Sequence, residues 1–208
     1  MCKKMNDKVK LLELFAGGKS VGKVADLLGW DVVSLDLKDA HINCNILDWD
    51  YTHYAPGTFD VIWASPPCNT FSCARRRWIG RHGYTKESLQ HDIDQIGLPL
   101  LHKTLDIIDY FKPKYWFIEN PQTGRMKEYM QQYDHYDVDY CQYSDWGYRK
   151  ATRIWTNVKG FAPRTCHKHC VNKIGRKHKI RVEGVHTTLK DRYRIPPLLI
   201  HELFDCLT

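Results

Sequence analysis

The sequence contains no apolar run close to the roughly 20 residues that a membrane-spanning helix requires, so we expect no membrane contact. Its first residues, Met1–Lys4, lack the apolar region of a secretory signal. Its eight cysteines are not set in a small secreted framework, which leads us to expect a reducing, intracellular setting. Internal repeats and low-complexity tracts are also missing. These absences argue against a membrane-embedded, secreted or repeat protein.

No break in composition divides the 208 residues, of which 43% are hydrophobic. This length suffices for one full core and predicts a single domain over residues 1–208. The pattern of apolar segments predicts an α/β fold with a mostly parallel, Rossmann-like sheet. The expected strands are Lys8–Phe15, Asp31–Leu35, Phe59–Ala64, Lys114–Glu119, Tyr136–Gln142 and Arg153–Asn157. The expected helices are Ser20–Leu28, Ser88–Tyr110, Arg125–Gln132 and Pro197–Cys206.

A glycine-rich turn of Phe15, Ala16, Gly17 and Gly18 follows the first expected strand. Glycines let the backbone approach a ligand, and the helix that follows offers free N–H groups to an anion. The spacing is not GxGxxG, which gives dinucleotide binding little support. The second strand is followed by Asp36, in the position from which a carboxylate binds ribose hydroxyls. A ribose with a small charged tail fits S-adenosylmethionine, although an ordinary βαβ unit explains each piece alone equally well.

A Pro-Pro-Cys sequence follows the expected strand Phe59–Ala64. Pro66 and Pro67 favour an extended loop that holds the Cys68 sulfur above the carboxyl end of a buried strand, where α/β sheets place their chemistry. A cysteine there suggests a nucleophile. Carbon 5 of a pyrimidine accepts a methyl group only after a thiolate has added at carbon 6. The alternative is a buried structural cysteine.

The aromatic-rich segment Lys114–Pro121 is typical of another buried strand and carries Glu119 near its end. Burial disfavours a charged carboxylate, so Glu119 is expected to hold a proton. A protonated Glu can donate to N3 of cytosine and accept from the 4-amino group, which would identify the base. The alternative is a carboxylate that caps the following turn.

Taken in order, these motifs resemble the cytosine-C5 methyltransferases, a family whose members act on DNA and, in one branch, on transfer RNA. The resemblance covers most of residues 9–157 and implies S-adenosylmethionine as the cofactor. It implies that the turn after the first strand is the cofactor loop and that Asp36 binds the ribose. It further implies that Pro66 belongs to the cofactor site, that Cys68 is the nucleophile, and that Glu119 binds cytosine.

Two motifs depart from the family pattern. Asn45 and Ile46 stand where the family has Asp-Ile beside the adenine, so the Asn45 amide oxygen would accept in place of a carboxylate, with Asp48 as a nearby substitute. The family also places a glutamine and two arginines under the target base. Arg149 and Ala151 replace the first two of these, which leaves Arg153 as the catalytic arginine that the resemblance implies.

The stretch that ends the chain is short and basic. The segment Arg194–Leu199 resembles the family's last motif, which packs against the cofactor loop. Family members that read long DNA sites insert a recognition domain after the arginine motif, whereas here only an insert of residues 158–193 is available. Between Arg149 and Arg194 there are 14 Lys and Arg against 2 Asp and Glu. Such a segment is expected to bind phosphates, with an affinity that falls as salt rises.

Within the basic regions, some side chains are expected to contact nucleic acid, and a solvated surface is the alternative. They are Arg149 and Lys150 beside the arginine motif, and Arg75, Arg76 and Arg77 after the nucleophile loop.

Potential zinc ligands also lie in the insert. Cys166, Cys170 and His178 are the expected ligands of a structural zinc ion, and His186 is nearby. The spacing is not a standard zinc-finger pattern, and solvated residues in a phosphate-binding loop are the alternative.

These observations lead us to expect a monomeric DNA cytosine-C5 methyltransferase that works through a covalent cysteine adduct. Three alternatives stay open. In the first, the substrate is RNA. In the second, the chain is a catalytically impaired nucleic-acid-binding relative. In the third, it modifies free pyrimidine nucleotides, against which the basic surface argues.

Overall fold

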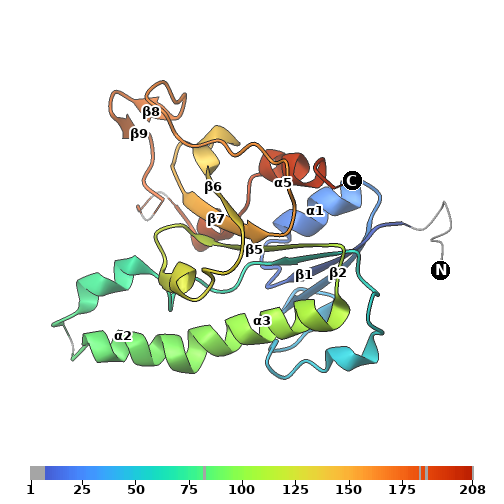
Figure 1. Cartoon of the computed structure of the whole chain (residues 1–208). Helices are drawn as coiled ribbons and strands as arrows, with labels where there is room; N and C mark the ends of the chain where they lie inside the picture. Colours follow the sequence, from blue (N-terminus) through green and yellow to red (C-terminus); the bar gives the residue numbers. More distant parts are fainter. Residues whose placement is uncertain (1–7, 82, 183, 186, 208) are drawn as a thin grey trace.

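The computed structural model describes residues 8–81, 83–182, 184–185 and 187–207. Its centre is a seven-stranded sheet in the order β3-β2-β1-β4-β5-β7-β6 (Figure 1). β7 runs antiparallel to both of its neighbours, whereas the other pairs are parallel. The expected α/β fold with a mostly parallel sheet is confirmed. The strands are β1 Lys10–Leu14, β2 Asp31–Asp36, β3 Ile42–Asn43, β4 Val61–Ala64, β5 Tyr115–Pro121, β6 His135–Asp139 and β7 Ala151–Thr156.

Helices cover both faces of the sheet. Figure 1 shows α3 along one face and α1 with α5 on the opposite face. A two-stranded hairpin stands apart from the sheet. The helices are α1 Ser20–Leu27, α2 Lys86–Asp92, α3 Leu98–Phe111, α4 Leu189–Tyr193 and α5 Pro197–Phe204, and the hairpin is β8 Lys173–Ile174 with β9 Lys177–His178. None of the helices in these described ranges is long and apolar enough to cross a membrane.

The sheet is apolar on both faces because alternate residues of a strand point to opposite sides. Leu11 of β1 packs in the core under α1 and α5, whereas its neighbour Leu12 packs in the core under α3. Aromatic side chains fill the first core: Trp63 stacks on Phe117, with ring centroids 4.9 Å apart. Burial of each such side chain contributes about 1.5–3 kcal/mol. The two cores fix the carboxyl ends of the central strands.

Two expected elements are wrong in part. The expected helix Arg125–Gln132 is only a 3₁₀ turn, Arg125–Glu128. Its first N–H donates to Phe71 O at 2.8 Å, and Met126 and Met130 are fully buried, so tertiary contacts override helix propensity there.

The expected strand Tyr136–Gln142 ends early, at Asp139, because Tyr140–Gln142 form a 3₁₀ turn. This turn buries Tyr140 completely.

The expected helix Ser88–Tyr110 is confirmed, with an irregularity at its centre. A π-helical turn, Ile93–Gly97, joins α2 to α3. A Cβ atom at Gly97 would lie 2.7 Å from Thr70 Oγ1 and 2.9 Å from Phe71 Cζ. Because Gly97 has no side chain, the loop after β4 packs directly on the helix. π-Helical turns are frequent at functional sites.

Candidate active site

A cavity of about 630 Å³ opens at the carboxyl ends of the central strands. Parallel strands end at the same edge of a sheet, and ligands of open α/β sheets bind there. The lining joins the glycine-rich loop after β1, Asp36 from β2, the Pro66–Cys68 loop after β4 and Glu119 from β5. Thus the cavity brings together all of the expected cofactor residues with the expected nucleophile and the cytosine-binding acid.

The loop after β1 is held in an unusual backbone conformation. Phe15 and Lys19 have φ angles of 58° and 55°, which non-glycine residues seldom adopt, and Gly17 has 47°. Gly17 N donates to Asp36 Oδ2 at 2.8 Å, and Leu37 N donates to Oδ1 at 2.7 Å. These bonds fix the Asp36 carboxylate at the cavity, where its remaining lone pairs can accept from hydroxyl groups.

Glu13 of β1, which sequence reasoning missed, also lines the cavity. Its carboxylate accepts from Val21 N at 3.1 Å and from Gly22 N at 3.0 Å, at the start of α1. Burial raises the pKa of Glu13 to about 7, although the two N–H bonds oppose this shift. A signal was present in the sequence, because an acid inside a buried apolar strand requires a specific partner.

Asn45 and Ile46 line the cavity as expected, whereas Asp48 is not among the lining residues. The Asn45 amide oxygen already accepts from Leu47 N at 3.1 Å. A carbonyl oxygen has a second lone pair, so Asn45 can still accept one further hydrogen bond.

The nucleophile loop is tied to the neighbouring strand. Cys68 is partly exposed to the cavity and forms no disulfide. The buried Asn120 Nδ2 donates to Pro66 O at 2.8 Å. This bond crosses from the end of β5 to the loop after β4, so it sets the position of Cys68 relative to Glu119.

Glu119 is a buried carboxylate with two partners, being only 6% exposed. The Tyr140 hydroxyl donates to its Oε1 at 3.0 Å, and Lys150 Nζ lies 3.4 Å from the same oxygen. Burial raises the pKa of Tyr140 well above its usual value, so the hydroxyl stays a donor. The ammonium group and the hydroxyl therefore both face one oxygen of the buried carboxylate.

The arginine motif is arranged differently from the expectation. Arg153 makes two hydrogen bonds to the Asp137 carboxylate, at 2.7 and 2.8 Å, and does not line the cavity. Burial would raise the pKa of Asp137, but the bonds from Arg153 and Gln122 hold it below its usual value. Arg149 donates to Asp139 Oδ1 at 2.6 Å. The cation that the structure brings to Glu119 is therefore Lys150.

The three arginines after the nucleophile loop differ in their surroundings. Arg75 forms an ion pair with Asp92 and contacts the Tyr84 hydroxyl. Arg76 and Arg77 are exposed on the 3₁₀ turn Cys73–Trp78.

The end of the chain returns to the cavity. Tyr193 and Ile195 are among its lining residues, and Ile195 N donates to Ser20 Oγ at 3.2 Å. This contact joins the segment Arg194–Leu199 to the start of α1, directly after the glycine-rich loop.

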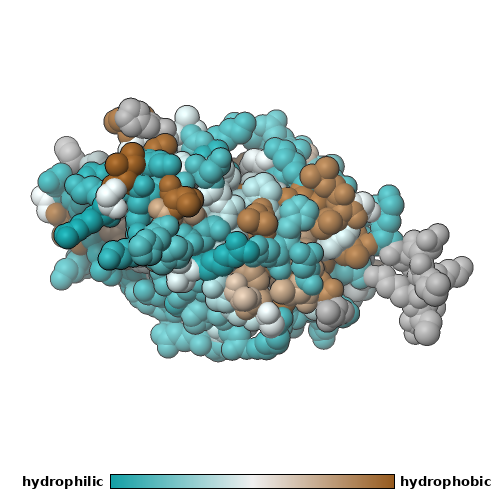
Figure 2. Space-filling view, turned by 90° about the horizontal axis from the view of Figure 1, so that it is seen from above, coloured by the Kyte–Doolittle hydropathy of each residue, from teal (hydrophilic) through white to brown (hydrophobic). Residues whose placement is uncertain are grey.

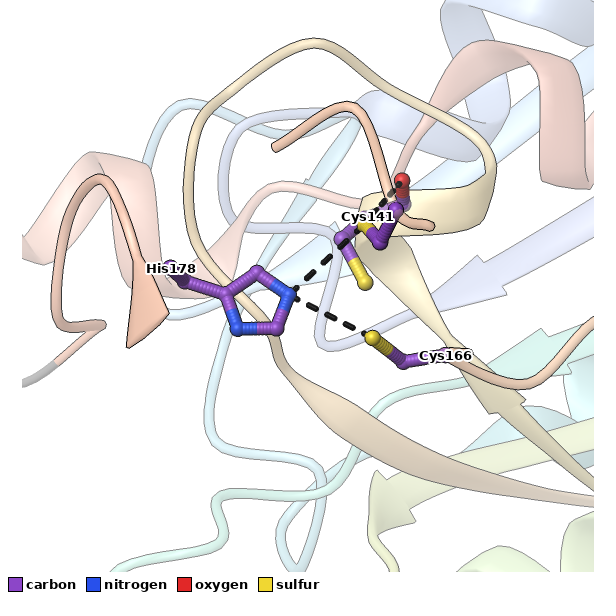
Figure 3. Close-up of side chains that lie close together, drawn as sticks. Cys141, Cys166 and His178 are labelled. Atoms are coloured by element: carbon purple, nitrogen blue, oxygen red, sulfur yellow. Dashed lines mark hydrogen bonds between the residues drawn. The ribbon is translucent and has the colours of Figure 1, made fainter. Parts of the chain in front are cut away.

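Away from the cavity, the expected zinc ligands lie together. Cys166, Cys170 and His178 form one group, which also contains Cys141 from the turn after β6. Figure 3 shows Cys141, Cys166 and His178 pointing toward one another. His186 lies outside the described residues. Cys141 could not be predicted as a fourth member, because it lies outside the insert along the chain.

Known proteins resemble this chain in sequence and in fold. Residues 36–128, which contain Cys68 and Glu119, match the model of the C-5 cytosine-specific DNA methylase family. The chain is 47% identical over 212 residues to a "Probable DNA (cytosine-5)-methyltransferase" of Frog virus 3 (isolate Goorha), in an alignment that covers 95% of this chain and 99% of that relative. The Entamoeba histolytica methyltransferase EhMeth has a similar fold, with a TM-score of 0.52 at 14% identity.

The alignment with EhMeth covers 83% of this chain and 57% of the other. Because the sequence identity is low, this likeness concerns the fold alone. The close viral relative and the family match go further: the chain belongs to the C-5 cytosine-specific DNA methylase family. The family resemblance that the motifs suggested is confirmed.

The buried Glu13 generates a prediction about pH and stability. Its pKa is raised from 4.5 to about 7, so the folded state favours the neutral acid. The raised pKa of Glu13 stabilises the folded state fully below pH 4.5, and this stabilisation is lost as the pH rises to about 7. In urea unfolding, wild type should lose about 3 kcal/mol relative to Glu13→Gln across this window. The exposed control Glu87→Gln should keep the wild-type profile, and parallel profiles for wild type and Glu13→Gln would contradict the assignment.

Proposed function

We propose that the protein transfers a methyl group from S-adenosylmethionine to carbon 5 of cytosine in DNA, through a covalent adduct with Cys68. The observation that carries this proposal is the single cavity that joins the Asp36 loop to Cys68 and Glu119. The family membership supports the reaction and the DNA substrate.

The first half of the cavity fits the cofactor. The Asp36 carboxylate is held in place and can still accept hydrogen bonds from ribose hydroxyls. The Asn45 amide oxygen can accept a hydrogen bond from an adenine amino group. A Cβ atom at Gly18 would meet nothing within 4 Å, so the loop leaves open space for a ligand. When bound, S-adenosylmethionine supplies an electrophilic methyl group to carbon 5.

The second half fits the base. A duplex hides carbon 6 of cytosine, so the base must leave the stack before a thiolate can reach it. The Cys68 thiolate then forms a bond to carbon 6, and the electron pair of the carbon 5–carbon 6 double bond moves to carbon 5. Carbon 5 uses this pair to take the methyl group, whose bond to the sulfonium sulfur breaks, so that S-adenosylhomocysteine would be the leaving group. Loss of the carbon-5 proton restores the double bond and expels the Cys68 thiolate.

Glu119 acts on the edge of the base that gains charge. Tyr140 and Lys150 both contact Oε1, which leaves Oε2 for a proton shared with cytosine N3. This proton stabilises the charge that develops when Cys68 adds. In this proposal Lys150 positions Glu119, whereas its place in the basic region predicts contact with nucleic acid.

The basic segment supports a polynucleotide substrate over a free nucleotide. Arg76 and Arg77, which follow the nucleophile loop in the sequence, and Arg149, which precedes Lys150, are exposed and are proposed to contact phosphates. Phosphate contact predicts an affinity that falls steeply with salt. RNA stays the second candidate, because the insert is small; methylation of RNA but not of DNA would favour it.

The nucleophile assignment predicts a covalent trap. DNA with 5-fluorocytosine at the target should form a stable complex with the wild type and cofactor, because fluorine cannot leave as a cation. Cys68→Ala should abolish both trapping and turnover, Cys68→Ser should be almost as inactive, and both should bind cofactor normally. The control Cys206→Ser, at a thiol that does not line the cavity, should be trapped like the wild type. Active wild-type protein that gives no band in a denaturing gel would rule out the adduct.

The base-recognition assignment predicts a loss of rate. Glu119→Gln should lower kcat by about two to four orders of magnitude, the usual range for a positioned proton donor. DNA affinity in a filter-binding assay should change much less. Glu128→Gln, an acid paired with Arg125 outside the cavity, should retain activity. A fully active Glu119→Gln variant would remove Glu119 from cytosine recognition.

The cofactor assignment predicts weaker binding without loss of the base site. Asp36→Ala should raise the Kd for S-adenosylhomocysteine by roughly 10- to 100-fold, the cost of losing hydrogen bonds to a charged acceptor. Isothermal titration calorimetry measures this value. Asp48→Ala removes an acid that does not line the cavity and should leave the Kd unchanged. Equal Kd values for the two variants would exclude Asp36 from the ribose site.

A further inference from the structure

Three thiols and one imidazole converge at the edge of the basic insert. The ligand atoms of Cys141, Cys166, Cys170 and His178 all lie within 4.8 Å of one another (Figure 3). Cys166 Sγ is 3.4 Å and Cys170 Sγ is 3.8 Å from His178 Nε2. With Zn–S bonds of about 2.3 Å and Zn–N bonds of about 2.0 Å, a tetrahedral site has S···N edges of about 3.6 Å. The four side chains are therefore spaced as the ligands of a zinc ion.

We propose that Cys141, Cys166, Cys170 and His178 bind a structural zinc ion. Thiolate and imidazole donors suit zinc, and hard cations such as Mg²⁺ and Ca²⁺ prefer oxygen. Four protein ligands close the coordination shell, so no position remains for a catalytic water. The ion is a separate feature from the cavity that holds Cys68.

The insert needs such a site because it has little apolar area to bury. Its strands β8 and β9 have two residues each. Val171 and Ile174 are 78% and 72% exposed. Figure 2 looks down on the face that carries α5 and the hairpin: hydrophilic residues cover much of it, and hydrophobic residues form separate patches. A polar segment of this kind gains its order from metal binding rather than from a core.

Hydrogen bonds already hold the ligand-bearing backbone in place. Asp139 Oδ2 accepts from Cys166 N at 2.7 Å. The buried Asn172 donates to Cys141 O at 2.8 Å and accepts from Gly147 N at 3.0 Å. Asn172 thus links the turn after β6 to the hairpin. Such outer contacts orient metal ligands and raise metal affinity.

The proposed ion also connects the insert to the base site. Cys141 follows Tyr140, whose hydroxyl donates to Glu119. Fixing Cys141 fixes the 3₁₀ turn that carries Tyr140, so zinc would stabilise the position of the Glu119 carboxylate. This consequence rests on the function proposed for Glu119, whereas zinc binding itself does not.

Metal content tests the proposal without any activity assay. Protein purified without an affinity tag or chelator should contain about one zinc ion per chain by inductively coupled plasma mass spectrometry. Cys141→Ser, Cys166→Ser and His178→Gln should each lower this content by roughly tenfold or more. Cys206→Ser, a matched thiol outside the group, should keep it. Circular dichroism checks that each variant is folded.

A second measurement covers the case in which a variant fails to fold. Wild-type protein reconstituted with Co²⁺ should show a thiolate-to-cobalt charge-transfer band and the strong visible bands of tetrahedral cobalt. Trace zinc in folded wild-type protein, with no cobalt band, would overturn the proposal. So would a disulfide among these cysteines found by mass spectrometry after alkylation, or full zinc content in Cys141→Ser and His178→Gln.

Discussion

The parallel pairing of β1, β4 and β5 is the constraint on which the candidate site depends. Leu14 of β1 pairs with Ala64 of β4, which in turn pairs with Ile118 of β5. The chain leaves the sheet after Leu14 and Ala64, whereas β5 continues to Pro121, so the loops after β1 and β4 begin beside Glu119. This register places the glycine-rich loop, Cys68 and Glu119 around one cavity. The hydrogen bond from Asn120 to Pro66 O then fixes the spacing of the last two.

Two buried carboxylates at this edge are satisfied in different ways. Glu13 accepts hydrogen bonds from two backbone N–H groups at the start of α1, and desolvation is still the largest influence on its pKa. Glu119 instead has a neighbouring ammonium group and a phenol, both on one oxygen. The first arrangement holds a loop in place. The second leaves an oxygen for a substrate, and this difference separates a structural acid from a candidate catalytic one.

Local sequence was sufficient where a motif follows directly on a buried strand. Asp36, Cys68 and Glu119 could be placed together because parallel strands share one functional edge. Lys150 was expected only to contact nucleic acid. Its ion pair with Glu119 could not be predicted, because Lys150 lies in the loop before β7, where strand alternation does not fix the direction of a side chain. Arg153 matches the family pattern by position alone, and its actual partner, Asp137, lies on β6.

The same limit explains the other misses. Cys141 joins the insert's ligands only because β6 ends early and its following turn meets the hairpin. The segment Arg125–Gln132 has helical propensity, but anchoring of its first turn to Phe71 O overrides that preference. In each case a contact between distant parts of the chain decides the outcome, and no periodicity records it.

The central claim is that Cys68 and Glu119 act together on carbon 5 of cytosine, and the position of the transferred methyl group tests it most directly. Purified protein is incubated with methyl-labelled S-adenosylmethionine and cytosine-containing DNA, which is then digested to nucleosides and separated by liquid chromatography with mass detection. The account predicts that the label is found in 5-methyl-2′-deoxycytidine. Label on an exocyclic nitrogen of cytosine or adenine would contradict it.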